Sequence, residues 1–177
     1  MKFVAGALAG LVAGLAVAAL ITFTGTVNVA ATSPDSSVTE WLLHTAMRRS
    51  VAARSGSVTA PKDYTEAQAK SGFQEYGAMC AGCHGAPGRM RSAAGKGMRP
   101  GAPDLAQAGQ SWDNASLFWI VRNGVNMTGM PAFGPTHDDD TIWNIVAFVR
   151  KLPGMSAEEY RAYESSAGGE MGQMHEH

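Results

Sequence analysis

A Cys-x-x-Cys-His motif, Cys80-Ala81-Gly82-Cys83-His84, constrains this 177-residue chain more than any other feature. Two thiols at this spacing lie on one helical turn, where each can form a thioether bond with a vinyl group of the same porphyrin. The histidine that follows is then held under the ring, where a nitrogen can ligate the iron. The sequence therefore predicts one covalently bound haem c, attached through Cys80 and Cys83, with His84 as the proximal ligand.

A bare Cys-x-x-Cys pair also occurs in redox dithiols and in zinc sites. Both cysteines of the chain belong to the motif, so no second pair exists to complete a zinc site and a disulfide framework is excluded. The surrounding sequence has no βαβ pattern of the thioredoxin type. Together with the adjoining histidine, these observations favour haem over the two alternatives.

The second axial position of the iron separates electron carriers from haem enzymes, and Met130 is the candidate ligand for it. It lies far enough beyond His84 for the chain to pass the haem edge and return on the opposite face. Gly129 permits a close backbone approach, and Pro131 stiffens the backbone beside the ligand. A thioether suits reduced iron and raises the reduction potential. Met127, three residues earlier in the same segment, is the competing candidate.

Several short motifs resemble, in order, the landmarks of the class I cytochromes c. They are Gly72-x-x-x-Tyr76 with Cys80-x-x-Cys83-His84-Gly85, Pro103-Asp104-Leu105, Phe118-Trp119-Ile120-Val121-x-Asn123-Gly124, Gly129-Met130-Pro131, and Ile142-Trp143-x-x-Val146-Ala147-Phe148. The resemblance covers about half of the chain, from Tyr64 to Pro153. It implies an all-α fold around one haem, with the first and last helices crossing near Gly72, and one-electron transfer as the activity.

Helix signals give the same fold class independently of the resemblance. Four polar residues are placed to cap helices: Thr65, Asp113, Thr136 and Ser156. The last of these helices is expected to be short and to end at Tyr163. No segment alternates convincingly with period two, so no sheet is predicted. Between His84 and Asp113 lies a loop rich in glycine and proline, and a carbonyl near Pro87 is expected to accept the free ring N–H of His84.

Residues 1–31 are predicted to form a transmembrane anchor. The run from Phe3 to Val27 carries no charge, is longer than the apolar part of a signal peptide and can span a bilayer. Lys2 supplies the cytoplasmic positive charge. A cleaved signal peptide is the alternative, because Val29-Ala30-Ala31 resembles a cleavage site. These features predict a single-pass protein of the bacterial inner membrane with its haem domain on the periplasmic side.

Gly6, Gly10 and Gly14 recur every fourth residue within this run. They form one stripe of small residues along a helix face, where another transmembrane helix can approach backbone to backbone. We therefore expect subunits of a membrane complex to pack on these glycines. Glycine is also simply common in membrane helices and signal sequences, which is the plainer interpretation.

Residues 32–63 are predicted to contain a helix, from a capping box at Ser37 to about Ala53, followed by a linker. Val38, Trp41 and Leu42 share one side of it, and arginines follow. This pattern suits the membrane interface, and a helix packed on the haem domain fits it equally well. The haem domain itself is expected over residues 64–155. Residues 156–177 are expected to form the short helix and a disordered tail. The methionines and histidines of this tail are suitable copper ligands, but a tail without a metal is the favoured interpretation.

Charge and the lack of catalytic groups favour an electron carrier over an enzyme. Between residues 65 and 155, eight Lys or Arg stand against seven Asp or Glu, so long-range steering of partners is weak. Four of these cations fall within Arg89–Arg99, where they can meet an acidic partner or a haem propionate. No acid–base constellation is present, and neither a nucleic acid nor a small-molecule substrate is expected. The partners are then redox proteins of a membrane respiratory or dehydrogenase chain; the alternative is a five-coordinate haem enzyme or gas sensor.

Overall fold

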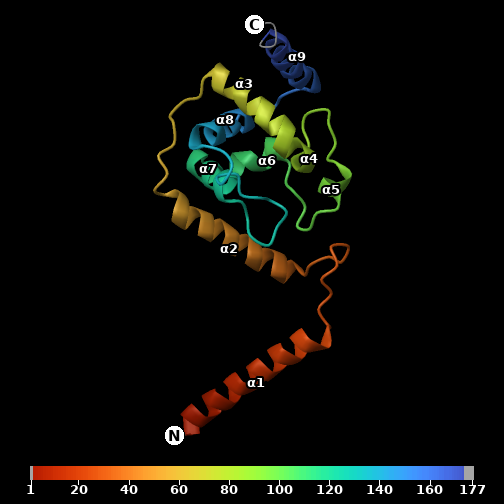
Figure 1. Ribbon diagram of the computed structural model, residues 1–177. Coiled ribbons are helices and arrows are strands. Elements are labelled where there is room, and N and C mark those ends of the chain that lie inside the picture. Colours follow the sequence, from red (N-terminus) through yellow and green to blue (C-terminus); the bar gives the residue numbers. More distant parts are fainter. Residues whose placement is uncertain (1, 174–177) are drawn as a thin grey trace. The chain divides into compact units, whose positions relative to one another are not determined.

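The computed structural model describes residues 2–173 and is helical, with no strand among those residues (Figure 1). The predicted all-α class is therefore confirmed. In chain order the helices are α1 (Lys2–Thr24), α2 (Ser37–Ser55), α3 (Glu66–Glu75), the π-helical turn η1 (Tyr76–Cys80), α4 (Ala81–His84), α5 (Ala93–Lys96), α6 (Leu105–Ala108), the 3-10 turn η2 (Gly109–Ser111), α7 (Asn114–Asn123), α8 (Asp139–Val149) and α9 (Ala157–Gln173). The chain divides into two compact units after Pro34.

The first unit consists of α1 and the segment that follows it. Helix α1 has 23 residues, contains an 18-residue stretch with a mean hydropathy of 2.4, and has no buried side chain. The hydroxyls of Thr22 and Thr24 donate to the carbonyls of Ala18 and Leu20, one turn earlier, so these two polar groups are satisfied within the helix. By length and composition α1 can cross a membrane, a property that it shares with signal sequences.

The second unit is built on the crossing of α3 and α8, which lie side by side in Figure 1. The predicted capping box starts α3: Thr65 Oγ1 accepts from the amide of Gln68, and the Gln68 side chain accepts from the amide of Thr65. At Gly72 the two backbones touch, because a Cβ there would lie 1.8 Å from the carbonyl oxygen of Asn144. The crossing near Gly72 implied by the resemblance is thus present.

The hydrophobic core of this unit is a cluster of aromatic and branched side chains around α8. The buried residues of α8 are Ile142, Ile145, Val146, Ala147, Phe148 and Val149. Phe148 lies 5.3 Å from Phe73 and 5.2 Å from Tyr76, ring centre to ring centre. On the other side, Phe118 of α7 stacks on Trp143 at 4.2 Å. Helices α3 and α7 are therefore both fixed against α8.

Two helices begin at residues other than those expected from the sequence. Helix α8 is capped by Asp138, whose carboxylate accepts from the amide of Thr141 at 2.8 Å. The hydroxyl of Thr136 donates instead to the carbonyl of Phe133, so it belongs to the preceding turn. Helix α2 is capped by Ser36, one residue before the expected Ser37.

Helix α2 packs on α7 through its carboxyl-terminal half. Val51 is buried, and the hydroxyls of Ser55 and Ser116 share a buried hydrogen bond of 3.1 Å. The guanidinium of Arg48 lies 4.3 Å from the centre of the Trp112 ring. For this half of the helix, the alternative of a helix packed on the haem domain is correct.

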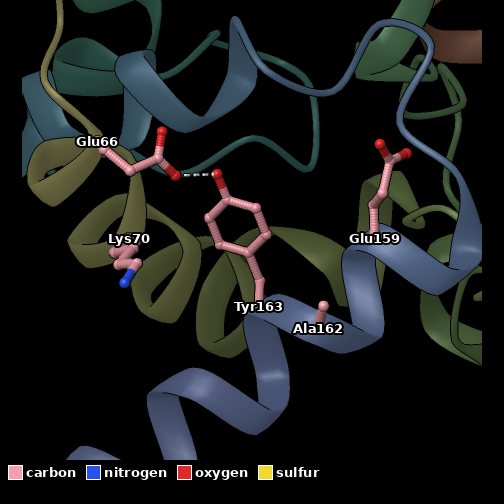
Figure 2. Close-up of a pocket in the computed structure, with 5 residues that line it drawn as sticks. All are labelled: Glu66, Lys70, Glu159, Ala162 and Tyr163. Atoms are coloured by element: carbon pink, nitrogen blue, oxygen red, sulfur yellow. Dashed lines mark hydrogen bonds between the residues drawn. The ribbon is translucent and has the colours of Figure 1, made fainter.

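Helix α9 is longer than expected: it continues beyond Tyr163, the expected end, to Gln173. Its first turns are fixed to the core: Tyr160 is buried against Phe73, and the hydroxyl of Tyr163 donates to Glu66 of α3 (Figure 2). Glu66 also pairs with Lys151, and these two hydrogen bonds, the one from Lys151 first, lower the pKa of the Glu66 carboxyl. The shallow hollow beside this pair is lined by Glu66, Lys70, Glu159, Ala162 and Tyr163. Residues 174–177 of the predicted disordered tail lie outside the described residues.

We expect Gly72→Ala to destabilise the protein by at least about 2 kcal/mol, because a methyl group cannot fit against a backbone carbonyl without separating α3 from α8. Guanidinium unfolding of the holoprotein, followed by circular dichroism, measures this loss. Gly77→Ala is the matched control, since a Cβ there meets nothing within 4 Å. Equal stability of the two variants would show that the crossing tolerates a side chain.

Candidate haem site

The Cys-x-x-Cys-His motif stands at the end of one continuous helical segment. Helix α3 passes directly into η1, which ends at Cys80, and then into α4, which carries Cys83 and His84. A π-helical turn inside a helix is frequent at functional sites. The buried hydroxyl of Tyr76 donates to the carbonyl of Gly85 at 2.6 Å, and burial raises the pKa of Tyr76, so the phenol remains a donor. This bond joins the turn that precedes the motif to the residue that follows it.

Both cysteines are free thiols in the structure. Cys80 is buried and Cys83 half-buried. Burial, followed by the proximity of Cys83 and Glu75, raises the pKa of the unmodified Cys80 thiol to about 12. Because disulfide exchange proceeds through a thiolate, this environment of Cys80 does not favour a reactive redox dithiol. No cluster of three or more metal-ligating side chains occurs among the described residues either.

The imidazole of His84 is held in the tautomer that a haem ligand requires. Its Nδ1 lies 2.8 Å from the carbonyl oxygen of Pro103. A carbonyl can only accept, so Nδ1 carries the proton and Nε2 keeps its lone pair. Burial lowers the pKa of His84 more than the hydrogen bond that its ring donates to Pro103 raises it, and this favours the neutral ring. The arrangement leaves Nε2 available to iron.

The expected acceptor near Pro87 is wrong. Pro87 lies in a tight turn closed by two backbone hydrogen bonds between Ala86 and Arg89, of 3.1 and 2.8 Å. This turn reverses the chain immediately after the motif, and the segment returns to the histidine only at Pro103. Pro103 was visible in the sequence as part of a family landmark, but nothing local connected it with the ring of His84.

The loop that follows the motif is fastened to it. The amide of Ser92 donates to the carbonyl of Gly82 at 2.8 Å. Within α5, a Cβ on Gly95 would lie 2.6 Å from the same carbonyl oxygen and 2.9 Å from Cα of Cys83. This glycine therefore allows the loop to lie directly against the turn that carries Cys83 and His84.

The loop between α7 and α8, which contains Met130, is held at both ends by backbone contacts. Gly124 has a positive φ of 66°, and its missing Cβ would meet the backbones of Met130, Pro131 and Ala132 at 2.7–2.8 Å. The amide of Phe133 donates to the carbonyl of Val121 at 3.2 Å. Pro131 itself is exposed. The path of the loop around Met130 is thus set by the end of α7.

The two candidate methionines of this loop differ in their surroundings. Met130 is half-buried and packs against the core, and its amide donates to Thr128 Oγ1 at 3.1 Å. Met127 has a positive φ of 60° and is 88% exposed. Both line an open hollow of about 380 Å³ together with Asn123, Val125, Asn126 and Thr128. Of the two thioethers, that of Met130 is the one supported by surrounding structure.

A second methionine lies against this loop and was not predicted to have any role there. The sulfur of Met98 lies 2.9 Å from the position that a Cβ of Gly129 would take. Met98 belongs to the segment after α5, so the loops that follow the motif and precede α8 meet at Gly129. Sequence reasoning offered no signal for this contact, because the two residues lie in separate irregular segments.

The side chains present fit haem c. They supply two free thiols three residues apart, an imidazole with a free Nε2, and a half-buried thioether on a loop packed against the same core. An all-α fold with this donor set defines a c-type cytochrome domain of class I.

The match to a protein-family model agrees with this class. Residues 67–149 match the family model described as cytochrome c oxidase, cbb3-type, subunit III. Among solved structures, the crystal structure of c-type cytochrome XoxG from Methylobacterium extorquens AM1 is 23% identical, over 56% of this chain and 67% of that one, with a TM-score of 0.37. None of the curated proteins compared matches the chain. Residues 67–149 therefore form a c-type cytochrome domain of class I, which supports an electron-transfer haem protein with covalently bound haem c.

We expect Gly124→Ala to displace Met130, because the new methyl group would meet only backbone atoms and the residue would keep a positive φ. Gly129→Ala is the matched control: its methyl group would meet only the flexible side chain of Met98, which can move. The two variants are compared by the absorption spectra of their ferric forms. The readout is the weak band at the red end of the spectrum that methionine-ligated haem shows. Loss of this band in both variants or in neither would contradict the expectation.

Proposed function

We propose that this protein is a membrane-anchored one-electron carrier, or the haem subunit of a membrane respiratory or dehydrogenase chain, with one haem c ligated by His84 and Met130. The observation that carries the proposal is the pair of supported ligands: a neutral imidazole fixed by Pro103 and a thioether on a loop fixed to α7. Two permanent protein ligands leave no open coordination site for a substrate or a gas.

In this proposal, the bound haem c supplies a single-electron couple, and the protein keeps its surroundings constant in both oxidation states. Pro103 orients the ring of His84 and prevents it from rotating. The hydrogen bond from Tyr76 to Gly85 holds the turn that carries this ligand. On the other side, the backbone bonds of the Met130 loop hold the thioether in place. Rigid ligands keep the structural change on reduction small, as outer-sphere electron transfer requires.

The membrane part of the proposal rests on α1. Its length and lack of buried side chains suit a retained anchor, and Lys2 at its start favours a cytoplasmic amino terminus with the haem domain on the periplasmic side of the inner membrane. The matched family is described as an oxidase subunit, which supports a place in a respiratory complex. Gly6, Gly10 and Gly14 share one face of α1, and a helix of a partner subunit is proposed to pack on this small-residue face.

We expect the ferric wild-type protein to show the absorption band of methionine-ligated haem, and Met130→Ala to lose it. The reduced variant should bind carbon monoxide readily, because its sixth position is open, whereas the reduced wild type should not. Met127→Ala is the control and should leave both properties unchanged. Carbon monoxide binding by the wild type would instead support the alternative, a five-coordinate haem enzyme or gas sensor.

We expect Gly10→Leu to weaken co-purification with membrane subunits, because the larger side chain keeps a neighbouring helix from approaching the glycine face. Mild detergent extraction of tagged protein, followed by identification of the haem-containing and membrane subunits retained, measures this. Val12→Leu, two residues along and on another side of α1, is the control. Unchanged retention with Gly10→Leu would mean that partners do not pack on this face.

A further inference from the structure

We propose that the amino-terminal half of α2 lies on the lipid surface of the membrane, with Val38, Trp41 and Leu42 inserted into the interfacial layer. The proposal rests on the proposed retained anchor, which keeps this helix near the bilayer. It adds a second membrane contact, and with it a fixed orientation of the cytochrome domain.

The first observation is an apolar stripe that the fold leaves uncovered. Val38, Trp41 and Leu42 are 69%, 67% and 57% exposed, whereas Val51, at the other end of the same helix, is 1% exposed. At about 100° per residue, the three exposed side chains fall within an arc of about 100°. Outside α1 and the segment after it, most of the exposed large apolar side chains lie on this half of α2; they are Val38, Trp41, Leu42 and Leu43, compared with Met90 and Met127 elsewhere.

The charges around the stripe complement an anionic lipid surface. Arg49 follows Val38 by eleven residues, about three turns, and so continues the same side of α2. It is exposed and has no ion pair among the described residues. The acidic groups nearby are directed elsewhere: Asp35 and Glu40 pair with Arg99, at 3.4 and 3.8 Å. The stripe therefore presents a tryptophan, two aliphatic side chains and an unpaired cation, the combination found at membrane interfaces.

The small size of the apolar stripe and the short connection between α1 and α2 favour lipid over a protein partner as the surface that covers the stripe. A standard protein interface uses about 20–30 residues on each side, and this stripe has three apolar ones. Shallow insertion of a few side chains by about 5–10 Å is sufficient for a helix that lies in the interface. Twelve residues separate Thr24 from Ser37, and ten of them, Gly25–Pro34, carry no charge. Fully extended, this connection spans at most about 40 Å, so the anchor keeps α2 close to the bilayer.

The contact has a consequence for electron transfer. The carboxyl-terminal half of α2 is fixed to α7 by the Ser55–Ser116 hydrogen bond and by Arg48 over Trp112. Helix α7 leads directly into the loop that carries Met130. If α2 lies on the membrane, the whole cytochrome domain takes one orientation relative to the bilayer, and a co-anchored redox partner meets the same face of it each time.

The test uses full-length holoprotein in vesicles of phosphatidylethanolamine and phosphatidylglycerol. The two native cysteines are consumed by haem attachment, so a single introduced cysteine can carry a nitroxide spin label. The three variants are Leu42→Cys on the stripe, Glu40→Cys as the matched control on another side of α2, and Leu15→Cys as the reporter of the anchor. Paramagnetic resonance power saturation then compares access of oxygen, which partitions into lipid, with that of a water-soluble nickel chelate.

At position 42 we expect oxygen to relax the spin label more than the nickel chelate does, because this label lies in lipid. At position 40 we expect the nickel chelate to relax the label more than oxygen does, because this label faces water. Equal access of the nickel chelate to positions 42 and 40, with position 15 in lipid, would overturn this inference and leave the anchor intact. Shielding of position 42 from both reagents would overturn it in favour of a protein partner or a second copy of the chain. A label at position 15 outside the lipid would overturn the anchor itself.

Discussion

The close crossing of α3 and α8 at Gly72 is the contact on which the placement of the haem site depends. Helix α3 runs without interruption into the turn that carries Cys80, Cys83 and His84, so any shift of α3 moves the attachment residues with it. Because the backbones touch at Gly72, Phe73 and Tyr76 reach Phe148 on α8. One residue without a side chain thus fixes the proximal half of the site.

The distal half depends on the same helix through α7. Stacking of Phe118 on Trp143 fixes α7 against α8, and Gly124 at its end lets the chain turn back so that Phe133 bonds to Val121. The turn that carries His84 and the loop that carries Met130 are therefore both held against α8, and neither residue belongs to that helix. With both residues as ligands of one haem iron, as proposed, this shared support keeps their separation constant in both oxidation states.

Patterns local in the sequence predicted much of this structure, and contacts between distant segments were missed. The helix caps at Thr65 and Asp113 are predicted correctly, because each depends on residues within a few positions of one another. The acceptor for His84 was placed near Pro87, because nearness in the chain was the only guide. A carbonyl nineteen residues away takes this role, since a tight turn first reverses the chain. The contact of Met98 with Gly129 has the same origin: it joins two loops without periodicity.

Two of the four cations that follow the motif form ion pairs within the protein. The sequence places four of them within Arg89–Arg99, which is suited to an acidic partner or a haem propionate. In the structure, however, Arg89 pairs with Glu164 and Arg99 with Asp35 and Glu40, so half of this charge is used to fasten α9 and the start of α2. A domain of nearly balanced charge that also pairs half of the cations in its basic loop attracts distant partners weakly. In the proposed function, encounter then depends on nearness, because a retained anchor raises the effective concentration of co-anchored proteins.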